Sequence, residues 1–522
     1  MKRFYLFPLL ALAACSATKA SDASTDAGTA ADVASSDALS DASGVGDAGQ
    51  DTSTGKYAFP ECDPAATTQR VSFVHVNDLH ASYAPQPDGV SPIARIIGYL
   101  KASRTSNPYT VFTDGGDAYE KGSVAEQISK GLSTREIMRA MKFDVRVIGN
   151  HDYAWSKEEV LANSQDPNAR VLSSNMQYIG DDPTQWQAVE YVALQIGCVK
   201  VGFFGFTSGP WDSTDSPIPG PFYPEFPATY EYAKLAQAIV DKHRKEVDLL
   251  IAVDHIGLSE DQALAKAVPG LDAVLSGHSH SFTLMPSDDG KSTPVVQSGA
   301  FCAHVVRLDL DVDLKSKQVT KVGYDTAGLG PDSNTPVDEA INQTVADIVR
   351  QHAPEWDKPL VQIENGVASD GAALVAMHAE LEVFQADAAL VDVHTTWSLW
   401  LPGPLTQQNF VDMFKVEREP AGTPGFNAAY TAKILGSELQ KLTTLDPLNW
   451  VFQGPTTIEP TKTYKIALQK RTALNPTHMP GGAVVTEPKA EMEMWEVLDK
   501  YARVRGKACK YLDSENVVEG CQ

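Results

Sequence analysis

The sequence predicts an α/β domain, because short apolar runs alternate with segments of helical periodicity from residue 70 onward. The apolar runs have the composition of strands, and each of them ends in Asp, Asn or His. In such domains a ligand lies outside the carboxyl ends of the strands. The pattern therefore predicts an edge at which these polar side chains gather.

The predicted elements follow in order along the chain. Strands are expected at residues 71–76, 109–112, 144–148, 248–253 and 271–275. Helices between them are expected at residues 92–103, 133–141 and 230–246. Another helix is expected at residues 337–352, with Ile341, Val345, Ile348 and Val349 on one face. The part beyond it mixes a strand at 463–469 with helices at 371–384, 436–442 and 491–503.

The residues that end the predicted strands are of types that bind metals. The first strand runs into Asn77-Asp78-Leu79-His80, where Asp78 and His80 share one face of an extended chain. The later strands run into Asp117, Asn150-His151-Asp152, Asp254-His255 and Gly277-His278-Ser279-His280. Glycines precede Asp117, Asn150 and His278, which suits tight turns where backbone approaches a ligand.

Imidazole suits zinc, iron and similar transition metals, whereas carboxylates suit harder divalent ions such as manganese. The candidate ligands are too many for one tetrahedral site. They are Asp78, His80, Asp117, Asn150, His255, His278 and His280. This set fits two divalent metal ions bridged by a carboxylate. Two metals about 3.5–4 Å apart can bind both an attacking hydroxide and a phosphoryl oxygen.

In this order the motifs resemble those of the calcineurin-like metallophosphoesterase superfamily over residues 70–310. Asn77-Asp78-Leu79-His80 and Asp254-His255-Ile256-Gly257 are more closely similar to the 5′-nucleotidase family. The resemblance implies a four-layer αββα sandwich over residues 57–330. It further implies a linker helix at 331–356 and a smaller α+β C-terminal domain at 357–522.

The same resemblance implies roles for individual residues. Asp78, His80 and His280 would hold one metal, while Asn150, His255 and His278 would hold the other. Asp117 would bridge the two. A metal-bound hydroxide would attack phosphorus, and His151 would stabilise charge in the transition state or protonate the leaving oxygen.

One departure concerns the group that orients His151. In 5′-nucleotidases a carboxylate stands three residues after the catalytic histidine, and here that position is Ala154. The protein-phosphatase branch of the superfamily instead uses an acidic residue three positions after the bridging aspartate, and here that residue is Glu120. We therefore expect Glu120 or Asp152 to orient His151. The alternative for Glu120 is a solvated surface acid.

The substrate motifs of the family are altered in the C-terminal part. An Asn-Gly-Gly-Gly-Ile-Arg-like run is replaced by residues 392–398, which contain no arginine to grip a phosphate. A Gly-Gly-Asp-Gly-Tyr-like run is replaced by residues 475–483, which contain no aromatic. Phe414 matches one stacking aromatic of the family, which leaves the substrate contacts unassigned. Trp397, Trp400 and Trp450 either stack on a ligand or, as is commoner for aromatics, pack in the core.

The first 56 residues are expected to lie outside the fold. Residues 1–14 have a basic start and an apolar run too short to span a bilayer, and they look like a bacterial lipoprotein signal. This implies lipidation of Cys15, although an ordinary signal peptide with a chance cysteine is the alternative. Residues 16–56 consist mainly of Ala, Ser and Asp and predict a disordered tether. We expect an exported protein, anchored in the periplasm or at the outer-membrane surface of a bacterium.

Charge and cysteine content narrow the possibilities further. A net charge of −24 over 522 residues argues against a binder of nucleic-acid duplexes and against a polybasic membrane-surface protein. Export permits disulfides among Cys62, Cys198, Cys302, Cys509 and Cys521. Their odd number leaves at least one free or paired between chains. A bridge between Cys509 and Cys521 is one possible pairing.

The sequence thus predicts a two-metal hydrolase of small phosphate esters, monoesters or diesters, including nucleotides. Two alternatives remain open at this point. One is hydrolysis of a non-nucleotide phosphate or of a sulfur ester, which the altered C-terminal motifs would allow. The other is a surface lipoprotein that binds a ligand or metal without turnover, for which a residue such as His151 would not be needed.

Overall fold

The computed structural model describes residues 57–120, 122–209, 223–285, 292–363, 366–396, 400–414 and 427–508. The predicted signal peptide, Cys15, the predicted tether, Trp397, Cys509 and Cys521 lie outside these residues. Within them, the structure contains no helix that is long and apolar enough to cross a membrane.

The first sheet contains six strands in the order β12-β11-β1-β2-β3-β4. Strands β1 to β4 run parallel to one another, and β11 and β12 are antiparallel neighbours at one side. The bounds are β1 (Thr68–Val76), β2 (Thr110–Asp114), β3 (Val145–Val147), β4 (Arg170–Leu172), β11 (His304–Asp313) and β12 (Gln318–Gly328). The predicted strands at 71–76, 109–112 and 144–148 are therefore β1, β2 and β3.

The second sheet also contains six strands, in the order β5-β6-β7-β8-β10-β9. Its central strands β6, β7, β8 and β10 are parallel. The bounds are β5 (Tyr191–Ile196), β6 (Val199–Phe204), β7 (Leu249–Val253), β8 (Ala273–Leu275), β9 (Phe282–Met285) and β10 (Val295–Ser298). The predicted strands at 248–253 and 271–275 are β7 and β8, so the five predicted strands belong to two sheets.

The two sheets pack face to face through one apolar cluster. Val71 and Phe73 of β1 meet Phe203 of β6 and Ile251 of β7 in this cluster. The rings of Phe73 and Phe203 lie edge to face with centroids 6.2 Å apart. Side chains alternate along a strand, so the residues between these point to the outer face of each sheet.

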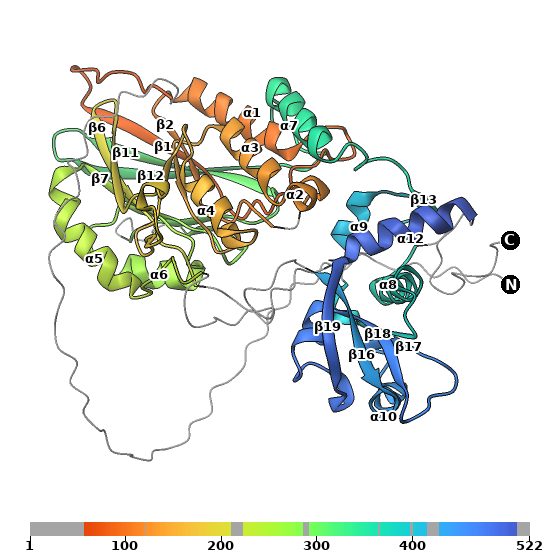
Figure 1. Cartoon of the computed structure of the whole chain (residues 1–522). Coiled ribbons are helices and arrows are strands. Elements are labelled where there is room, and N and C mark those ends of the chain that lie inside the picture. Colours follow the sequence, from red (N-terminus) through yellow and green to blue (C-terminus); the bar gives the residue numbers. More distant parts are fainter. Residues whose placement is uncertain are drawn as a thin grey trace, which may run out of the picture. The chain divides into compact units, whose positions relative to one another are not determined.

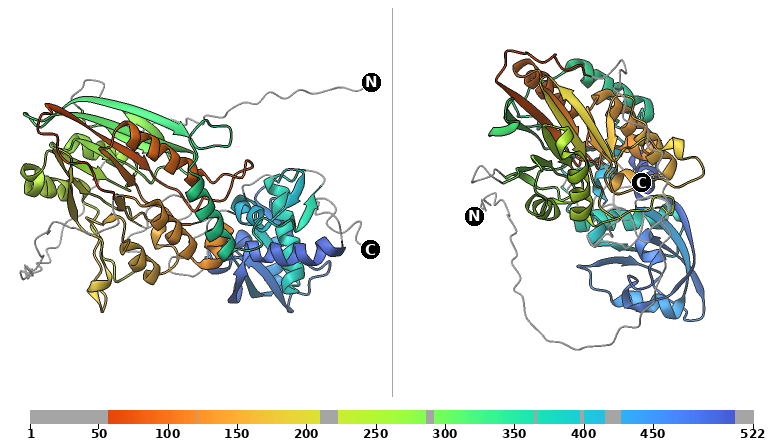
Figure 2. Two further views of the ribbon diagram at one scale, coloured as in Figure 1. Left: turned by 90° about the horizontal axis from the view of Figure 1, so that it is seen from above. Right: turned by 90° about the vertical axis from the view of Figure 1, so that its left-hand side faces the viewer.

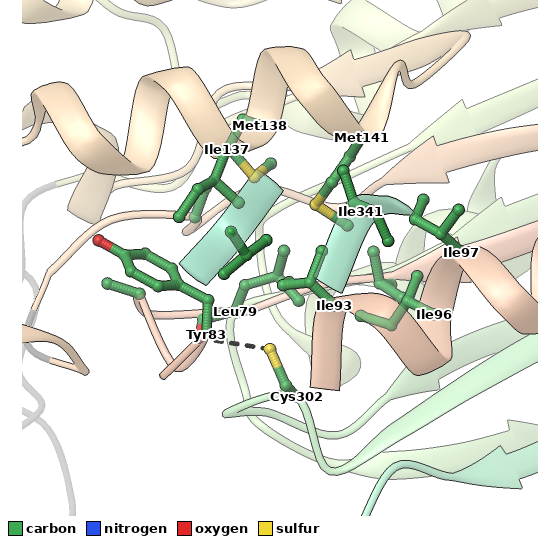
Figure 3. Packing of buried hydrophobic residues seen from close by; sticks show 14 of the residues in the cluster. Leu79, Tyr83, Ile93, Ile96, Ile97, Ile137, Met138, Met141, Cys302 and Ile341 are labelled. Carbon is green, nitrogen blue, oxygen red and sulfur yellow. Dashed lines mark hydrogen bonds between the residues drawn. The ribbon is translucent and has the colours of Figure 1, made fainter. Parts of the chain in front are cut away.

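Helices cover both outer faces (Figure 1). On the first sheet lie α1 (Pro92–Ser106), α3 (Leu132–Met141) and α7 (Glu339–His352), and Figure 2 shows α7 beside α1. Figure 3 shows side chains of these three helices pointing toward one another, among them Ile93, Met141 and Ile341. The second sheet is covered by α5 (Tyr232–His243) and α6 (Leu258–Ala267). The four-layer αββα sandwich is confirmed, and the predicted helix at 337–352 packs in its outer layer.

The C-terminal region contains a five-stranded mixed sheet in the order β17-β14-β18-β16-β19. Its strands are β14 (Ala388–Asp392), β16 (Ala428–Leu435), β17 (Trp450–Gln453), β18 (Thr463–Gln469) and β19 (Val485–Glu493). Helices α8 (Ser369–Phe384), α9 (Gln407–Met413) and α12 (Met494–Ala508) pack in the cluster on one face. Helices α10 (Gly436–Leu439) and α11 (Lys470–Leu474) adjoin the cluster on the other face. Strands β13 (Val361–Ile363) and β15 (Gly403–Leu405) form a separate pair.

The cysteines of the described residues form one disulfide. Cys62 is bonded to Cys198, which lies between β5 and β6. Cys302 is free and buried, and its thiol lies beneath Leu79 (Figure 3). Cys302 thus agrees with the expectation that at least one cysteine stays free. The pairing considered for Cys509 and Cys521 lies outside the described residues.

Candidate metal centre

The predicted ligand residues come together at the carboxyl ends of strands from both sheets. Asp78 and His80 follow β1, Asp117 follows β2, and Asn150 follows β3. From the second sheet, His255 follows β7, while His278 and His280 follow β8. Three further short elements that follow β2 or β3 along the chain are α2 (Val124–Ser129), the 3₁₀ helix η1 (His151–Tyr153) and α4 (Lys157–Ser164).

One group of potential ligand atoms consists of Asp78, His80 and His280. His80 Nε2 and His280 Nε2 lie 2.9 Å apart, and Asp78 Oδ1 lies 3.3 Å from His280 Nε2 and 3.7 Å from His80 Nε2. Asp78 is fully buried, and its Oδ1 accepts no well-formed hydrogen bond from the described residues. Two ring nitrogens and a carboxylate oxygen that face one point fit a metal ion.

A second group consists of Asp117, His255 and His278. His255 Nε2 lies 3.0 Å from Asp117 Oδ2 and 3.0 Å from Asn150 Oδ1. His278 Nδ1 lies 2.8 Å from the same Asn150 oxygen. Asp117 Oδ2 is also 3.9 Å from His80 Nε2, so the carboxylate of Asp117 faces both groups.

The electrostatics of these groups favour a bound cation. Burial lowers the pKa of His80 and of His278 to about 3, with neighbouring histidines acting in the same direction. Both rings are therefore neutral, as metal binding requires. Burial also opposes a charge on His255, but the nearby Asp117 and Asp78 carboxylates outweigh it and raise the pKa of His255 to about 10. The negative potential of these two carboxylates thus favours a cation at this position.

The backbone at this edge is unusual. Asp78, His80, Asp117, His278 and His280 all have positive φ, between 47° and 78°. This left-handed conformation is unfavourable for residues with a Cβ atom and concentrates at functional sites. Gly149 allows the closest approach, because a Cβ atom there would collide with Asp117 Oδ1.

His151 stands beside the two groups. Its Nε2 lies 3.8 Å from Asp117 Oδ2, and its Nδ1 contacts Glu120 Oε2. Glu120 is fully buried, so the interpretation of Glu120 as a solvated surface acid is wrong. Asp152 does not contact the His151 ring in this way. Its two oxygens accept backbone N–H groups of Ala118 and Gly149 at 3.0 and 2.7 Å.

Sequence reasoning did not find Phe301, which lies at this site. Its ring centroid is 5.1 Å from that of His80 and 5.2 Å from that of His280, and 43% of the residue is exposed. Phe301 has a φ of 54°, and its N–H donates to the Asp78 carbonyl at 2.8 Å. No motif marks this residue in the sequence, because its contacts come from strands far apart along the chain.

The C-terminal residues have more ordinary surroundings. Phe414 and Trp400 are buried in the apolar cluster of that region, so packing accounts for both of them. Trp450 is partly exposed, with its ring centroid 5.3 Å from that of His478. His478 Nε2 in turn lies 3.0 Å from Asp392 Oδ2. The altered runs at 392–398 and 475–483 thus meet through a carboxylate–imidazole contact.

Parts of the chain are similar to known proteins. Residues 71–282 match the family of calcineurin-like phosphoesterases, so the chain contains a calcineurin-like phosphoesterase domain. Bovine 5′-nucleotidase is 25% identical over 59% of this chain and 58% of its own length. Snake venom 5′-nucleotidase from Crotalus adamanteus is 27% identical over 50% of this chain and 48% of its own length. The chain thus matches only about half to three-fifths of each of these relatives.

Similarity to solved structures covers more of the chain than residues 71–282. The 5′-nucleotidase precursor from Thermus thermophilus superposes with a TM-score of 0.61 at 16% identity. The superposition covers 83% of this chain and 96% of the other. The described fold, including the C-terminal region, is therefore similar to the fold of this 5′-nucleotidase precursor.

Proposed function

We propose that this protein is a metal-dependent phosphoesterase that hydrolyses small phosphate esters, nucleotides among them. The observation that carries the proposal is the convergence of two groups of ligand atoms on Asp117, with His151 beside them. The match to calcineurin-like phosphoesterases and the 5′-nucleotidase relatives support the same reaction class. A sulfur ester or a non-nucleotide phosphate is not needed to account for these observations.

In this proposal two divalent cations bind at the edge where the sheets meet. Asp78, His80 and His280 would hold one, Asn150, His255 and His278 would hold the other, and Asp117 would be a ligand for both. When bound, such cations supply positive charge for phosphoryl oxygens and lower the pKa of water. The candidate ions are zinc, manganese, iron and cobalt.

His151 is the proposed proton donor to the leaving oxygen. Its Nε2 faces the ligand groups, while its Nδ1 contacts the buried Glu120 carboxylate. A carboxylate on one ring nitrogen fixes the ring orientation and stabilises the imidazolium form. Glu120 thereby orients the His151 ring, which Ala154 cannot do because it has no carboxylate. It is a positioning residue in this scheme.

The proposed location is outside the cytoplasm, with a lipid anchor at Cys15. The lipoprotein-like start of the sequence and the Cys62–Cys198 disulfide support export. Labelling of the full chain with a radioactive fatty acid in a bacterial host tests the anchor. Cys15→Ser should abolish both the label and the membrane association, and label retained in that variant would contradict the proposal.

The function is tested on the purified folded part without its first 56 residues. Metal content is measured, and then p-nitrophenyl phosphate, its bis-ester and AMP are assayed with each candidate metal. Metal-dependent hydrolysis of at least one substrate is expected, together with strong loss in His151→Asn. Absence of hydrolysis with all four metals would favour a surface protein that binds metal or ligand without turnover.

A further inference from the structure

Glu126, a buried carboxylate outside the proposed ligand set, lies next to the segments that carry His151 and Glu120. Glu126 belongs to α2, and its side chain is fully buried. Its Oε1 accepts the backbone N–H of Glu120 at 2.5 Å and the indole N–H of Trp155 at 2.9 Å. Its Oε2 accepts the hydroxyl of Thr134 in α3.

These bonds join the two chain segments that carry the pair. Glu120 lies in the loop between β2 and α2, whereas His151 begins η1, which follows β3. Trp155 lies just after η1, so its indole ties the His151 segment to Glu126. One buried oxygen atom of Glu126 thus binds both the Glu120 segment and the His151 segment.

The backbone of Glu120 needs such support. Its φ is 79°, in the left-handed region that favours glycine, and its side chain is completely buried. A residue held in this conformation persists only when surrounding contacts over-determine it. The hydrogen bond from the Glu120 amide to the Glu126 carboxylate is a contact of this kind.

We propose that Glu126 is a positioning residue, which holds the Glu120 carboxylate against His151 Nδ1 through the backbone amide of Glu120 and the indole of Trp155. The inference rests on the proposed function for its kinetic consequence, but the geometric role of Glu126 holds whether or not the protein turns over a phosphate ester. Glu126 touches neither the ligand groups nor His151 in the described contacts, so it acts only through its neighbours.

The test compares Glu126→Ala, Glu126→Gln and Trp155→Phe with the parent in the metal-loaded folded chain. Misplacing a catalytic group by about 1 Å can cost about 100-fold in rate. Glu126→Ala should therefore lower kcat for p-nitrophenyl phosphate by about 10- to 100-fold with KM changed by less than about 2-fold. Glu126→Gln keeps an oxygen acceptor and should recover most of the rate. Trp155→Phe keeps the ring, removes one donor and should fall between them.

A double-substitution cycle separates positioning from general damage. If Glu126 acts through Glu120, then adding Glu126→Ala to Glu120→Gln should lower kcat by less than about 2-fold further. The matched control is Glu380→Ala, which truncates another fully buried glutamate in the C-terminal region and should leave kcat and KM unchanged. The proposal would be overturned if the losses in kcat of Glu126→Ala and Glu120→Gln multiplied in the double variant. It would also be overturned if Glu380→Ala lost as much kcat as Glu126→Ala.

Crystal structures of the parent, Glu126→Gln and Glu126→Ala provide a readout that does not depend on turnover. The contact between Glu120 Oε2 and His151 Nδ1 should persist in the first two and be broken in the third. If the contact between Glu120 and His151 stayed intact in Glu126→Ala, the positioning role would be refuted, even if this variant had a low kcat. Should the parent hydrolyse none of the substrates, the proposed function fails while these structures still decide the role of Glu126.

Discussion

Two fully buried glutamates, Glu126 in the sandwich and Glu380 in α8 of the C-terminal region, have opposite surroundings. Glu126 receives hydrogen bonds from a backbone amide, an indole and a hydroxyl. Neither carboxyl oxygen of Glu380 has a hydrogen-bond partner among the described residues. A buried polar group with partners organises its neighbours, whereas one without partners costs stability.

The regions around these two glutamates also differ in their polar contacts. Around Glu126 the buried polar groups form a connected set that leads to His151, Asp117 and the candidate metal ligands. In the C-terminal region a contact joins the side chains of Asp392 and His478. We therefore expect the chemistry at the edge of the sandwich, where Asp117 and His151 lie close together.

The largest expected effect concerns Asp117, which faces both ligand groups. Asp117→Ala should lower the metal content and reduce hydrolysis of p-nitrophenyl phosphate by at least about 1,000-fold, because it removes a ligand shared by both cations. Metal analysis together with steady-state kinetics checks this. Replacing Asp392, a buried aspartate of the C-terminal cluster, by Ala serves as the control and should leave the metal content unchanged. Full metal occupancy in Asp117→Ala would contradict the ligand assignment.

His151→Asn should come next in size. Loss of a general acid costs about 100- to 10,000-fold in kcat. The metal content should stay at the parent level, because the proposed ligand groups do not need this ring. Kinetics and metal analysis on the same preparation separate the two effects. If metal is lost together with activity, His151 is a ligand rather than a proton donor, which the group His80, Asp117 and His151 would also permit.

Glu120→Gln should cost less, about 10- to 100-fold in kcat, which is the typical loss when a partner that orients a metal-binding histidine is removed. The leaving group supplies a sharper test. Protonation matters little for p-nitrophenolate and much for an alkoxide, so the loss should be greater for an alkyl phosphate than for p-nitrophenyl phosphate. Equal losses for both substrates would argue that Glu120 supports the fold and not the proton transfer.

The smallest expected effect concerns stability in the C-terminal region. Glu380→Leu should stabilise the protein by about 1–3 kcal/mol near neutral pH, because it removes a buried carboxyl group without hydrogen bonds. Thermal unfolding of both proteins measures the difference. In the same assay Glu126→Leu should destabilise, since three donors lose their acceptor. Equal signs for the two substitutions would contradict the opposite surroundings assigned to these glutamates.

The effect at Glu380 should also depend on pH. Burial raises the pKa of this carboxyl well above its ordinary value of 4.5. The folded state then keeps a proton that the unfolded chain releases, so the contribution of Glu380 to stability decreases as pH rises above about 4.5. The advantage of Glu380→Leu should therefore be smallest near pH 4 and grow toward neutral pH. A difference independent of pH would show that Glu380 has the same pKa in both states.

Much of the fold could be predicted because local patterns agree with the tertiary structure. The strand expected at residues 463–469 is β18 with the same bounds, and the helix expected at 371–384 is α8 with two residues added at its start. The helix at 230–246 was expected as one element, but it divides into α5 and the 3₁₀ helix η3 (Arg244–Glu246). Terminal turns are decided by local hydrogen bonding and leave little trace in periodicity.

The sequence pattern did not predict the order of the strands within the sheets. The predicted ligands were expected at one edge, and they do meet, but β1, β2 and β3 belong to one sheet while β7 and β8 belong to the other. Pairing between strands depends on contacts distant along the chain, such as that of β1 with β11. The alternation of strands and helices is the same for one sheet as for two.

The sequence by itself determined the candidate ligands, His151 and the class of fold, because each ligand directly follows an apolar strand and the motifs keep their order. The tertiary structure alone decided between Glu120 and Asp152 as the neighbour of the His151 ring. In the sequence both were candidates, because Asp152 directly follows His151 and Glu120 stands three residues after Asp117. It alone revealed Glu126, Phe301 and the isolation of Glu380. Such contacts arise between segments that only packing brings together, so no local pattern encodes them.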